Sequence, residues 1–289
     1  MPTLQQKEAI ASTKLEGTQA TLDEVLINQI EPDKNNQNLN EVSNYFHATV
    51  LGLKMLQIGS FSDDFLCKIH EALLFGNDRK RENALIGVYR NTQNFIGMTN
   101  GSREITYILP APQNVPTLMK NLIEYINDPH DSLQPLVRVA IIHAQMETIH
   151  PFDDGNGRVG RIMIPLYLYK KQQISLPCFF ISEALESDKF KYYRLLDGTR
   201  EKGNWNEWIK FFLQTVAKQC EKYIYIIERI NQMYEEHLCL AKSLISNNAV
   251  VDIINAIYKQ PILSLSEFEK ETNLSPATIN RYRQPLTDI

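Results

Sequence analysis

The chain has little cysteine, and its four cysteines form no CxxC pair and no regular spacing. All four have apolar neighbours, which favours buried free thiols over disulfides or zinc ligands: Cys67, Cys178, Cys220 and Cys239. The N-terminal segment lacks the apolar core of a signal peptide, and no hydrophobic run approaches the length of a membrane span. We therefore expect a cytoplasmic protein that works in a reducing compartment and does not contact a membrane.

The charge balance also limits the function. A net charge of −4 excludes a surface that is basic throughout, so nucleic-acid binding needs a local argument. Internal repeats and low-complexity tracts are absent. The 289 residues, 43% of them hydrophobic, suit one large domain or two smaller ones.

Helical periodicity dominates the sequence. Gly17 is placed to end a first helix, and Thr21 with Glu24 resembles a capping box that opens a second. One segment differs: residues 95–108 alternate around Asn100-Gly101, the strongest short signal for a tight β-hairpin turn. We expect helices at residues 5–16, 21–29, 41–57, 62–75, 115–127, 133–148, 158–170, 187–197, 204–232 and 233–245, with two short ones after 248.

Residues 150–161, His-Pro-Phe-Asp-Asp-Gly-Asn-Gly-Arg-Val-Gly-Arg, are the most informative part of the chain. Their Gly-Asn-Gly stands directly before a predicted helix, whose first N–H groups and dipole favour a bound anion. Arg158 and Arg161 lie three residues apart on that helix, so both guanidinium groups project to neighbouring positions. The segment therefore predicts a phosphate-binding cradle with two clamps.

Acid–base groups precede this cradle. His150 is the group that can accept a proton near neutral pH, and Asp153 and Asp154 offer hard oxygen ligands for magnesium on a nucleotide phosphate. Phe152 is expected to anchor the loop in the core. Taken singly, these residues also suit a capping histidine and surface ion pairs. A metal site built from His143, His150 and Asp154 is a further alternative, although His143 better fits a core-facing helical position.

The same residues match every defining position of the Fic motif HxFx(D/E)GNGRxxR, so the chain resembles the Fic family. That resemblance implies a mainly α-helical fold and transfer of AMP from ATP, with magnesium, to a hydroxyl of a target protein. It implies His150 as the base and Asp154 as the metal ligand. The related Doc protein, which phosphorylates, has Lys where this chain has Gly157, which favours AMP transfer. The implied nucleotide-binding residues are Asp154, Gly155, Asn156, Gly157, Arg158, Gly160 and Arg161.

A second match lies far upstream. Ser12-Thr-Lys-Leu-Glu16-Gly17 fits the pattern (S/T)xxxE(G/N), which marks an inhibitory helix in this family, although Gly17 also suits a plain helix C-cap. A carboxylate from Glu16 would compete with the ATP γ-phosphate for Arg161, and Ser12 would hydrogen-bond near the same site. The resemblance thus predicts an auto-inhibited enzyme.

The resemblance further implies a flap that docks the target by strand addition, with a decorative surface hairpin as the alternative. The flap residues are Gly97, Met98, Thr99, Asn100 and Gly101. Tyr192 and Tyr193 resemble an aromatic pair that lines the adenine pocket, and a nearby position that is Asn in some relatives is Arg200 here.

After about Ser246 the composition resembles a winged-helix module, with Thr278, Asn280, Arg281 and Arg283 on a candidate recognition helix. Nearby acidic residues favour packing or partner recognition over DNA binding. The predicted division is an N-terminal helical region at 1–60, a Fic core at 61–218, connecting helices at 219–245 and the winged-helix-like module at 246–289. Alternative functions are removal of AMP from a modified protein and a DNA-binding regulator with a nucleotide-sensing Fic site. The oligomeric state, a homodimer included, stays open.

Overall fold

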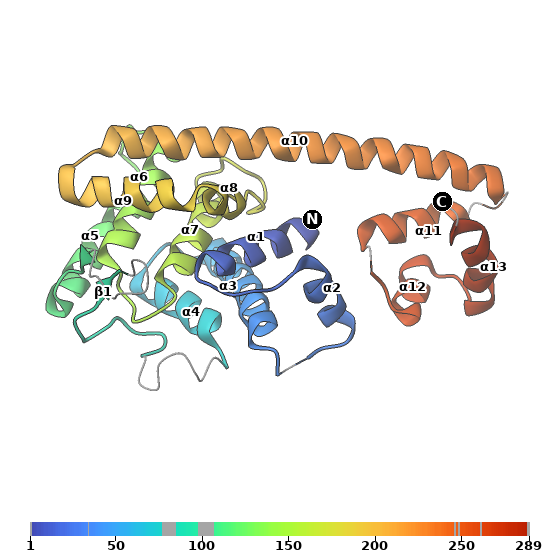
Figure 1. The fold of residues 1–289 in the computed structure, drawn as a ribbon, viewed down its shortest axis with the longest axis horizontal. Helices are drawn as coiled ribbons and strands as arrows, with labels where there is room; N and C mark the ends of the chain where they lie inside the picture. Colours follow the sequence, from blue (N-terminus) through green and yellow to red (C-terminus); the bar gives the residue numbers. More distant parts are fainter. Residues whose placement is uncertain are drawn as a thin grey trace. The chain divides into compact units, whose positions relative to one another are not determined.

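The computed structural model describes residues 2–33, 35–76, 85–97, 107–245, 247, 249–260 and 262–287. The chain divides into two units, residues 3–25 with 33–219 and residues 26–32 with 220–289. Helices make up most of both units, as the periodicity predicts (Figure 1).

The first unit holds α1 (Pro2–Leu15), α3 (Gln37–Ile58), α4 (Asp63–Leu74), β1 (Phe95–Ile96), β2 (Tyr107–Ile108), the 3₁₀ turn η1 (Pro112–Asn114), α5 (Val115–Asn127), α6 (Pro135–Ile149), α7 (Asn156–Lys170), α8 (Ser182–Ser187) and α9 (Lys189–Lys202). The second holds α11 (Ala249–Lys259), α12 (Leu265–Thr272) and α13 (Pro276–Thr287). Two helices, α2 (Leu22–Ile30) and α10 (Trp205–Leu244), have residues in both units.

Helix α7 is the central helix of the first unit. It packs against α3, α4 and α6, and it lies among them in Figure 1. The helix is buried on every side from Asn156 to Leu168, its two arginines included. Among its apolar side chains, Ile162, Ile164, Leu166 and Leu168 are at most 2% exposed. This buried helix carries the motif at its N-terminal end.

The first two helix boundaries follow the predicted caps. Gly17 adopts a left-handed φ of 97° after α1, and the N–H of Thr18 donates to the carbonyl of Thr13 at 3.1 Å. At the start of α2, the Thr21 N–H donates to Glu24 Oε2 at 2.7 Å, and the Glu24 N–H donates back to Thr21 Oγ1 at 3.3 Å. The N-terminal segment therefore ends and restarts its helices where the sequence indicates.

The predicted hairpin is present at its base. Strands β1 and β2 pair antiparallel, with Phe95 opposite Ile108 and Ile96 opposite Tyr107. The predicted turn at Asn100-Gly101 lies outside the described residues.

Three helical predictions were wrong. After residue 248 the described residues form three helices, α11, α12 and α13, where two short ones were expected. The expected break at 232/233 is absent, because α10 runs without interruption for 40 residues that include no Gly and no Pro. The short helix α8 was not predicted, since its six residues are too few for a clear periodicity.

The prediction for the cysteines was half right. All four are free, but Cys239 is exposed and the other three are only partly buried. Apolar neighbours in the sequence do not bury a side chain on a helix, since neighbouring positions face different directions.

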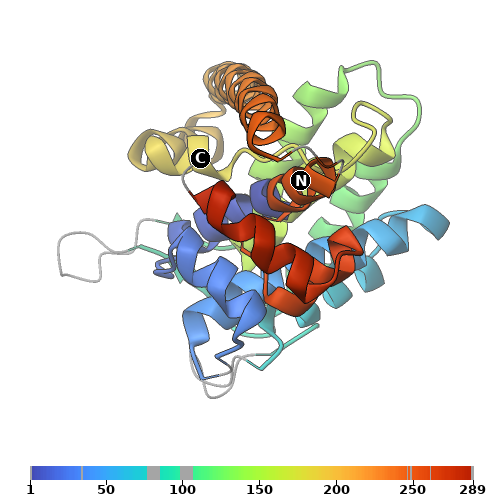
Figure 2. The same cartoon turned by 90° about the vertical axis from the view of Figure 1, so that its right-hand side faces the viewer.

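The second unit has a small core of its own. Ala241 and Ile245, from the end of α10 onward, pack with Val250 and Ile254 of α11. Helices α11, α12 and α13 gather in one group in both views (Figures 1 and 2). A turn at Asn273, with a φ of 53°, connects α12 to α13. The winged-helix assignment stays a prediction. In the described part of the chain, no helix is both long and apolar enough to cross a membrane.

Candidate functional site

The motif residues 150–161 connect the end of α6 to the start of α7. His150 caps α6 in the left-handed region, with φ 51° and ψ 61°, while its N–H still donates to the Met146 carbonyl at 2.9 Å. Gly155 is left-handed too, with φ 76°, and it caps the N-terminus of α7. These two residues reverse the chain, so the candidate base and the free N–H groups of α7 lie at the two ends of one short loop.

His70 of α4 packs against this loop and forms a hydrogen bond with its backbone. Its ring stacks on buried Phe152, with centroids 3.9 Å apart and planes 5° from parallel. The N–H of Gly87 donates to His70 Nδ1 at 3.0 Å, so the ring proton is on Nε2, which donates to the Asp154 carbonyl at 3.0 Å. Burial lowers the pKa of His70 to about 4, which keeps the ring neutral and this tautomer fixed.

Asn156 closes the loop with its side chain. Its Oδ1 accepts from the Phe152 N–H at 2.8 Å, and its Nδ2 donates to the Phe152 carbonyl at 2.9 Å. The amide group is therefore committed to the loop itself. What Asn156 offers to an anion is its backbone N–H in the first turn of α7.

Arg90 binds the backbone of the motif, a contact that the sequence analysis did not predict. It is 2% exposed and donates from Nε to the His150 carbonyl at 2.9 Å. The other guanidinium nitrogens reach the carbonyls of Pro110 at 2.7 Å and Thr92 at 3.1 Å, on either side of the hairpin. Its own N–H donates to the Pro151 carbonyl at 2.8 Å. Arg90 thus ties the backbone of the candidate base to the base of the hairpin.

His150 is suited to accept a proton. Burial lowers its pKa to about 4, against a smaller opposing effect of the Glu16 carboxylate, so the imidazole is neutral at neutral pH. The Nδ1 atom is buried, while 21% of the side chain is exposed. Nε2 is therefore the nitrogen available to a substrate.

Arg161 is paired with the N-terminal helix. Its Nη2 lies 2.6 Å from Glu16 Oε1 and 2.9 Å from the Ser12 carbonyl oxygen, and its Nε donates to Ser12 Oγ at 2.8 Å. Burial of Arg161 opposes its charge, but Glu16 together with the nearby Glu147, Tyr192 and Tyr193 outweighs burial and raises the pKa of Arg161 above its ordinary value. At Glu16, burial is outweighed by the charge and hydrogen bond of Arg161 together with the charges of Arg158 and His150, which lower its pKa, so both groups are charged. The contact expected between Glu16 and Arg161 is present.

The absence of a side chain at Gly157 leaves room for the Glu16 carboxylate. A Cβ built on Gly157 would collide with Glu16 Oε1 and would lie 2.8 Å from Arg161 Nη1. The carboxylate therefore occupies the space directly above the first turn of α7. This is the space in which the sequence predicts a phosphate.

Arg158 contacts different carboxylates from Arg161. It is 1% exposed, and its Nη1 and Nη2 lie 3.5 Å from Glu41 Oε2 and 3.5 Å from Asp154 Oδ2. Thr18, just after α1, donates its hydroxyl to the same Glu41 carboxylate. Nε and Nη1 of Arg158 have no hydrogen-bond partner within the described structure. These two buried donors can serve an anion that enters the site.

The two aspartates have different surroundings. Asp153 accepts from the Leu85 N–H at 3.1 Å and from the Thr92 hydroxyl at 3.4 Å, which fixes it to the segment before the hairpin. Asp154 is 35% exposed in its side chain, and its Oδ1 accepts from the Gly155 N–H at 2.7 Å. It fits a magnesium ion held by one protein carboxylate together with nucleotide oxygens.

The alternative metal site is not formed. The described residues contain no group of three His, Cys, Asp or Glu side chains that could hold a metal ion. His143 is 1% exposed and shares a hydrogen bond of 2.9 Å between its Nε2 and the Tyr192 hydroxyl. The core-facing position predicted for His143 is confirmed.

The remaining predicted nucleotide contacts lie beside this core. Tyr192 is fully buried, whereas Tyr193 is 36% exposed and its ring packs against Tyr192 at 4.9 Å. Gly160 faces α6, where an added Cβ would lie 3.2 Å from His143 Nδ1. Tyr193 is thus the aromatic ring of the pair that a ligand can reach, and Gly160 allows α7 to approach α6.

The predicted flap is described in part. Gly97 follows β1 with a φ of 155°, and Met98, Thr99, Asn100 and Gly101 lie outside the described residues. Arg200 of α9 packs over the ring of Tyr107 in β2, with 4.6 Å between its guanidinium carbon and the ring centroid. The base of the hairpin is therefore anchored to the unit that holds His150.

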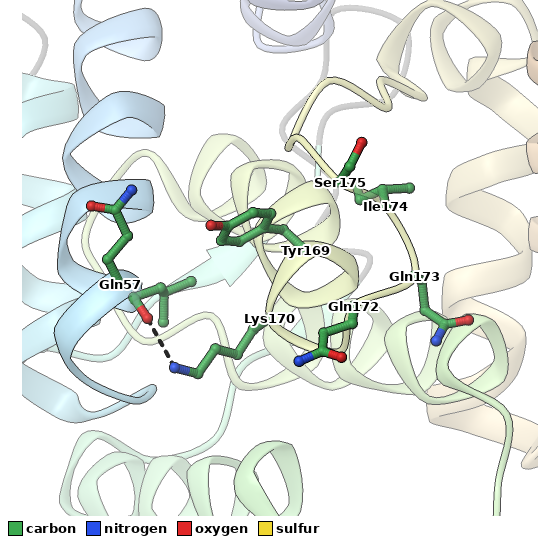
Figure 3. A pocket seen from close by; sticks show the side chains of 8 residues that line it. Gln57, Tyr169, Lys170, Gln172, Gln173, Ile174 and Ser175 are labelled. Atoms are coloured by element: carbon green, nitrogen blue, oxygen red, sulfur yellow. Dashed lines mark hydrogen bonds between the residues drawn. The ribbon is translucent and has the colours of Figure 1, made fainter.

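A cavity of about 600 Å³ lies at the opposite end of α7 (Figure 3). Lys170 crosses it to donate to the carbonyls of Leu56 at 2.8 Å and Gly59 at 2.7 Å, at the end of α3. Its lining holds glutamines, a tyrosine and one lysine but no carboxylate and no histidine. Because the lysine is committed to backbone carbonyls and the lining supplies no carboxylate or histidine, the motif remains the candidate site.

Comparison with known proteins identifies the family of this chain. The model of the Fic/DOC family matches residues 60–168, and the model of the Fic/DOC family N-terminal region matches residues 1–54. The chain belongs to the Fic/DOC family. The protein adenylyltransferase Fic of Drosophila melanogaster is 27% identical over 147 residues, and that of Drosophila grimshawi is 29% identical over 126 residues. These matches cover 50% and 40% of this chain, but only 27% and 24% of the two relatives. The chain thus matches about a quarter of the length of these distant relatives.

Solved structures show the same fold. A Fic family protein from Desulfovibrio desulfuricans G20 aligns with a TM-score of 0.67 at 22% identity, over 99% of this chain and 80% of that one. A Fic domain containing signaling protein from Bacteroides thetaiotaomicron aligns with a TM-score of 0.62 at 17% identity, over 75% of this chain and 84% of that one. The mainly helical Fic fold with a small two-stranded hairpin is therefore shared.

Proposed function

We propose that this Fic chain is an auto-inhibited protein adenylyltransferase. It transfers AMP from ATP to a Tyr, Thr or Ser hydroxyl of a target protein, or of itself, and releases pyrophosphate. The observation that carries the proposal is the pairing of a neutral, partly exposed His150 with the N-terminus of α7 across one short loop. The names of the Drosophila relatives support the choice of AMP as the transferred group.

Each residue of the motif has its own role in this AMP transfer. His150 takes the hydroxyl proton of the target on Nε2, and the resulting oxygen attacks the α-phosphorus in line. The N–H groups of the first turn of α7 stabilise the charge on the phosphate oxygens, and Arg158 and Arg161 bind the outer phosphates. Pyrophosphate is the leaving group. The exposed side of Tyr193 is placed to pack against adenine.

Asp154 would hold the magnesium ion. Its carboxylate supplies hard oxygen donors, and its partial exposure leaves room for an ion shared with the nucleotide. When bound, magnesium neutralises phosphate charge and orients the leaving group. Arg158, 3.5 Å from the same carboxylate, keeps that side chain directed at the site.

Glu16 is the inhibitory residue in this proposal. Its carboxylate and an ATP γ-phosphate would compete for the same guanidinium, that of Arg161, and for the same space above Gly157. With Glu16 in place, ATP cannot adopt the pose in which its α-phosphorus meets the target oxygen. Ser12 strengthens the block, because it occupies Nε of Arg161.

Labelled ATP tests the proposal. We expect label at the α-phosphate, but not at the γ-phosphate, to be incorporated into protein by the Glu16→Gly variant. The His150→Ala change in that variant should abolish incorporation, while Thr148→Val on the same helix serves as a control outside the motif. Transfer of the γ-label, or transfer that survives His150→Ala, would show that the proposal is wrong.

Removal of AMP is the second candidate, and one observation favours it. The Glu16 carboxylate is 31% exposed, and its charge acts on His150. A carboxylate there could hold a water molecule for hydrolysis of an AMP-modified side chain. Release of AMP from a modified protein by the unmodified chain, but not by Glu16→Gly, would favour removal over transfer.

A further inference from the structure

Glu147 is a buried carboxyl group that the scheme above leaves unused. It lies on α6, three residues before His150, and is 5% exposed. Its Oε2 is 4.0 Å from His150 Nδ1. Glu147 Oε1 is buried and has no hydrogen-bond partner within the described structure, and the buried His150 Nδ1 faces the backbone of Glu147 as well as its carboxylate. A buried carboxylate oxygen without a hydrogen bond is costly, so its position beside the base calls for a functional reason.

The packing of α7 makes room for this carboxyl. An added Cβ on Gly160 would lie 3.1 Å from Glu147 Oε1, so a side chain at Gly160 would press on the carboxyl group. Groups from three helices and from the segment after α1 face Glu147 or act on it through their charge. They are His143 and His150 of α6, Arg161 of α7, Tyr192, Tyr193 and Arg200 of α9, and Glu16.

We propose that Glu147 is the positioning residue for His150, because its ionised carboxylate keeps the single proton of the neutral imidazole on Nδ1 and leaves Nε2 free. The distance of 4.0 Å exceeds a hydrogen bond, and such contacts commonly shorten when substrate binds. A small rotation of either side chain brings the carboxylate to Nδ1–H. The role in proton uptake rests on the proposed AMP transfer, whereas the preference for one tautomer does not.

The proton balance is simple. The target hydroxyl loses its proton to Nε2, and the Nδ1 proton stays where it is. The ring becomes an imidazolium cation beside the Glu147 carboxylate, which remains an anion and stabilises the cation. No proton has to move onto Glu147.

Protonation of Glu147 would reverse this arrangement. Its O–H would then donate to Nδ1, the ring proton would reside on Nε2, and Nε2 could no longer accept a proton. Burial, assisted by the Glu16 charge and opposed by Arg161 and Arg200, raises the pKa of Glu147 to about 7. Because the pKa of His150 is lowered to about 4, loss of activity on acidification starts with Glu147. As the pH falls, protonation of Glu147 therefore stops His150 from accepting a proton before His150 itself becomes protonated.

Rates in the Glu16→Gly background test the proposal. The rate of AMP transfer should fall on the acid side of neutrality, somewhat below pH 7 because the Glu16 charge is gone. In Glu147→Ala that acid limb should disappear and kcat should drop about 10- to 100-fold, with KM for ATP within about twofold. Met146→Leu, a change in the same buried turn that keeps the charges, should retain the limb. An acid limb that persists in Glu147→Ala overturns the proposal.

Nitrogen-15 NMR of the histidine rings gives a second measurement in the unmodified chain, which reports the tautomer without any change at Glu147. His150, identified by its loss in His150→Ala, should carry its proton on Nδ1 at about pH 8 and on Nε2 below the pKa of Glu147. An unchanged tautomer across this range contradicts the proposal even if AMP transfer is found. If AMP transfer is absent while the tautomer changes, the proposed function fails and the role of Glu147 stands.

Discussion

Arg161 and Glu16 form an ion pair of 2.6 Å across the first turn of α7, although 145 positions separate them in the sequence. Arg161 is 1% exposed, so it has no alternative partner in solvent. Its Nε and Nη2 are both occupied by the segment at 12–16. A phosphate that binds Nε or Nη2 of Arg161 must therefore displace this segment, and the consequences can be measured.

Loss of the Glu16 charge should activate the enzyme. Glu16→Gly frees Arg161 and the space above Gly157, and we expect AMP incorporation to rise about 5- to 150-fold, the usual range for coupling between two states. Glu16→Gln, which keeps the volume but removes the charge, should give an intermediate rise. Incorporation of labelled AMP measures both. Equal rates in the unmodified chain and in Glu16→Gly would rule out inhibition by Glu16.

Ser12→Ala should activate less. It removes the hydroxyl that accepts from Arg161 Nε, while the Ser12 carbonyl still accepts from Nη2. We expect a roughly two- to tenfold rise in the same assay, because one charge-assisted hydrogen bond is lost. The hydroxyl of Thr13 bonds only to carbonyls of its own helix, so Thr13→Ala controls for a weaker α1. A larger effect from Thr13→Ala than from Ser12→Ala would contradict this assignment.

Arg90→Lys should lower the rate without changing nucleotide binding. A lysine keeps the charge but cannot reach the carbonyls of His150, Pro110 and Thr92 together. In the Glu16→Gly background we expect kcat to fall about tenfold to a hundredfold, since displacement of a catalytic group by an ångström has effects of this order. Calorimetric titration with a non-hydrolysable ATP analogue should give the same Kd. A changed Kd with unchanged kcat would place Arg90 outside the positioning of His150.

Stability should fall with acidification because of His70. Its pKa is about 4 in the folded chain and near 6.5 for an exposed histidine, so the unfolded state binds more protons between these values. The stabilisation by neutral His70 is therefore full above pH 6.5 and is lost as the pH falls toward 4. The gap of about 2.5 pH units, at about 1.4 kcal/mol per unit, is on the order of 3 kcal/mol.

Urea unfolding at a series of pH values measures this loss. His143 and His150 are also buried with lowered pKa values and add to the slope in the same direction, whereas Glu8 and Glu147, whose pKa values burial raises to about 7, oppose it. His70→Gln removes one titrating group and keeps a donor for the Asp154 carbonyl. A slope equal to that of the unmodified chain would show that His70 is not responsible.

Much of the site could be predicted because its signals are local. The caps at Gly17 and Thr21, the helix that begins after Gly155 and the buried Phe152 each depend on residues only a few positions apart. The Glu16–Arg161 contact is not local, and the family motif was needed to predict it.

The other contacts of the site could be found only from the fold. Arg90 and Glu41 reach the motif from other elements, and the sequence does not show which partners either charge has. Glu147 is close to His150 in the sequence, but only the packing of α7 against α6 shows that its carboxyl is buried beside the ring. Pairing and burial of single charges depend on tertiary contacts, which sequence periodicity does not encode.

The absence of a side chain at Gly157 limits which substitutions could release the proposed inhibition. The surface that admits a phosphate also admits the carboxylate of Glu16, because both need the space that a side chain at this position would fill. We expect a side chain at Gly157 that displaces the carboxylate also to crowd a phosphate bound in the proposed pose. On the proposed function, changes in the N-terminal segment are therefore the ones expected to release inhibition while the catalytic motif is left untouched.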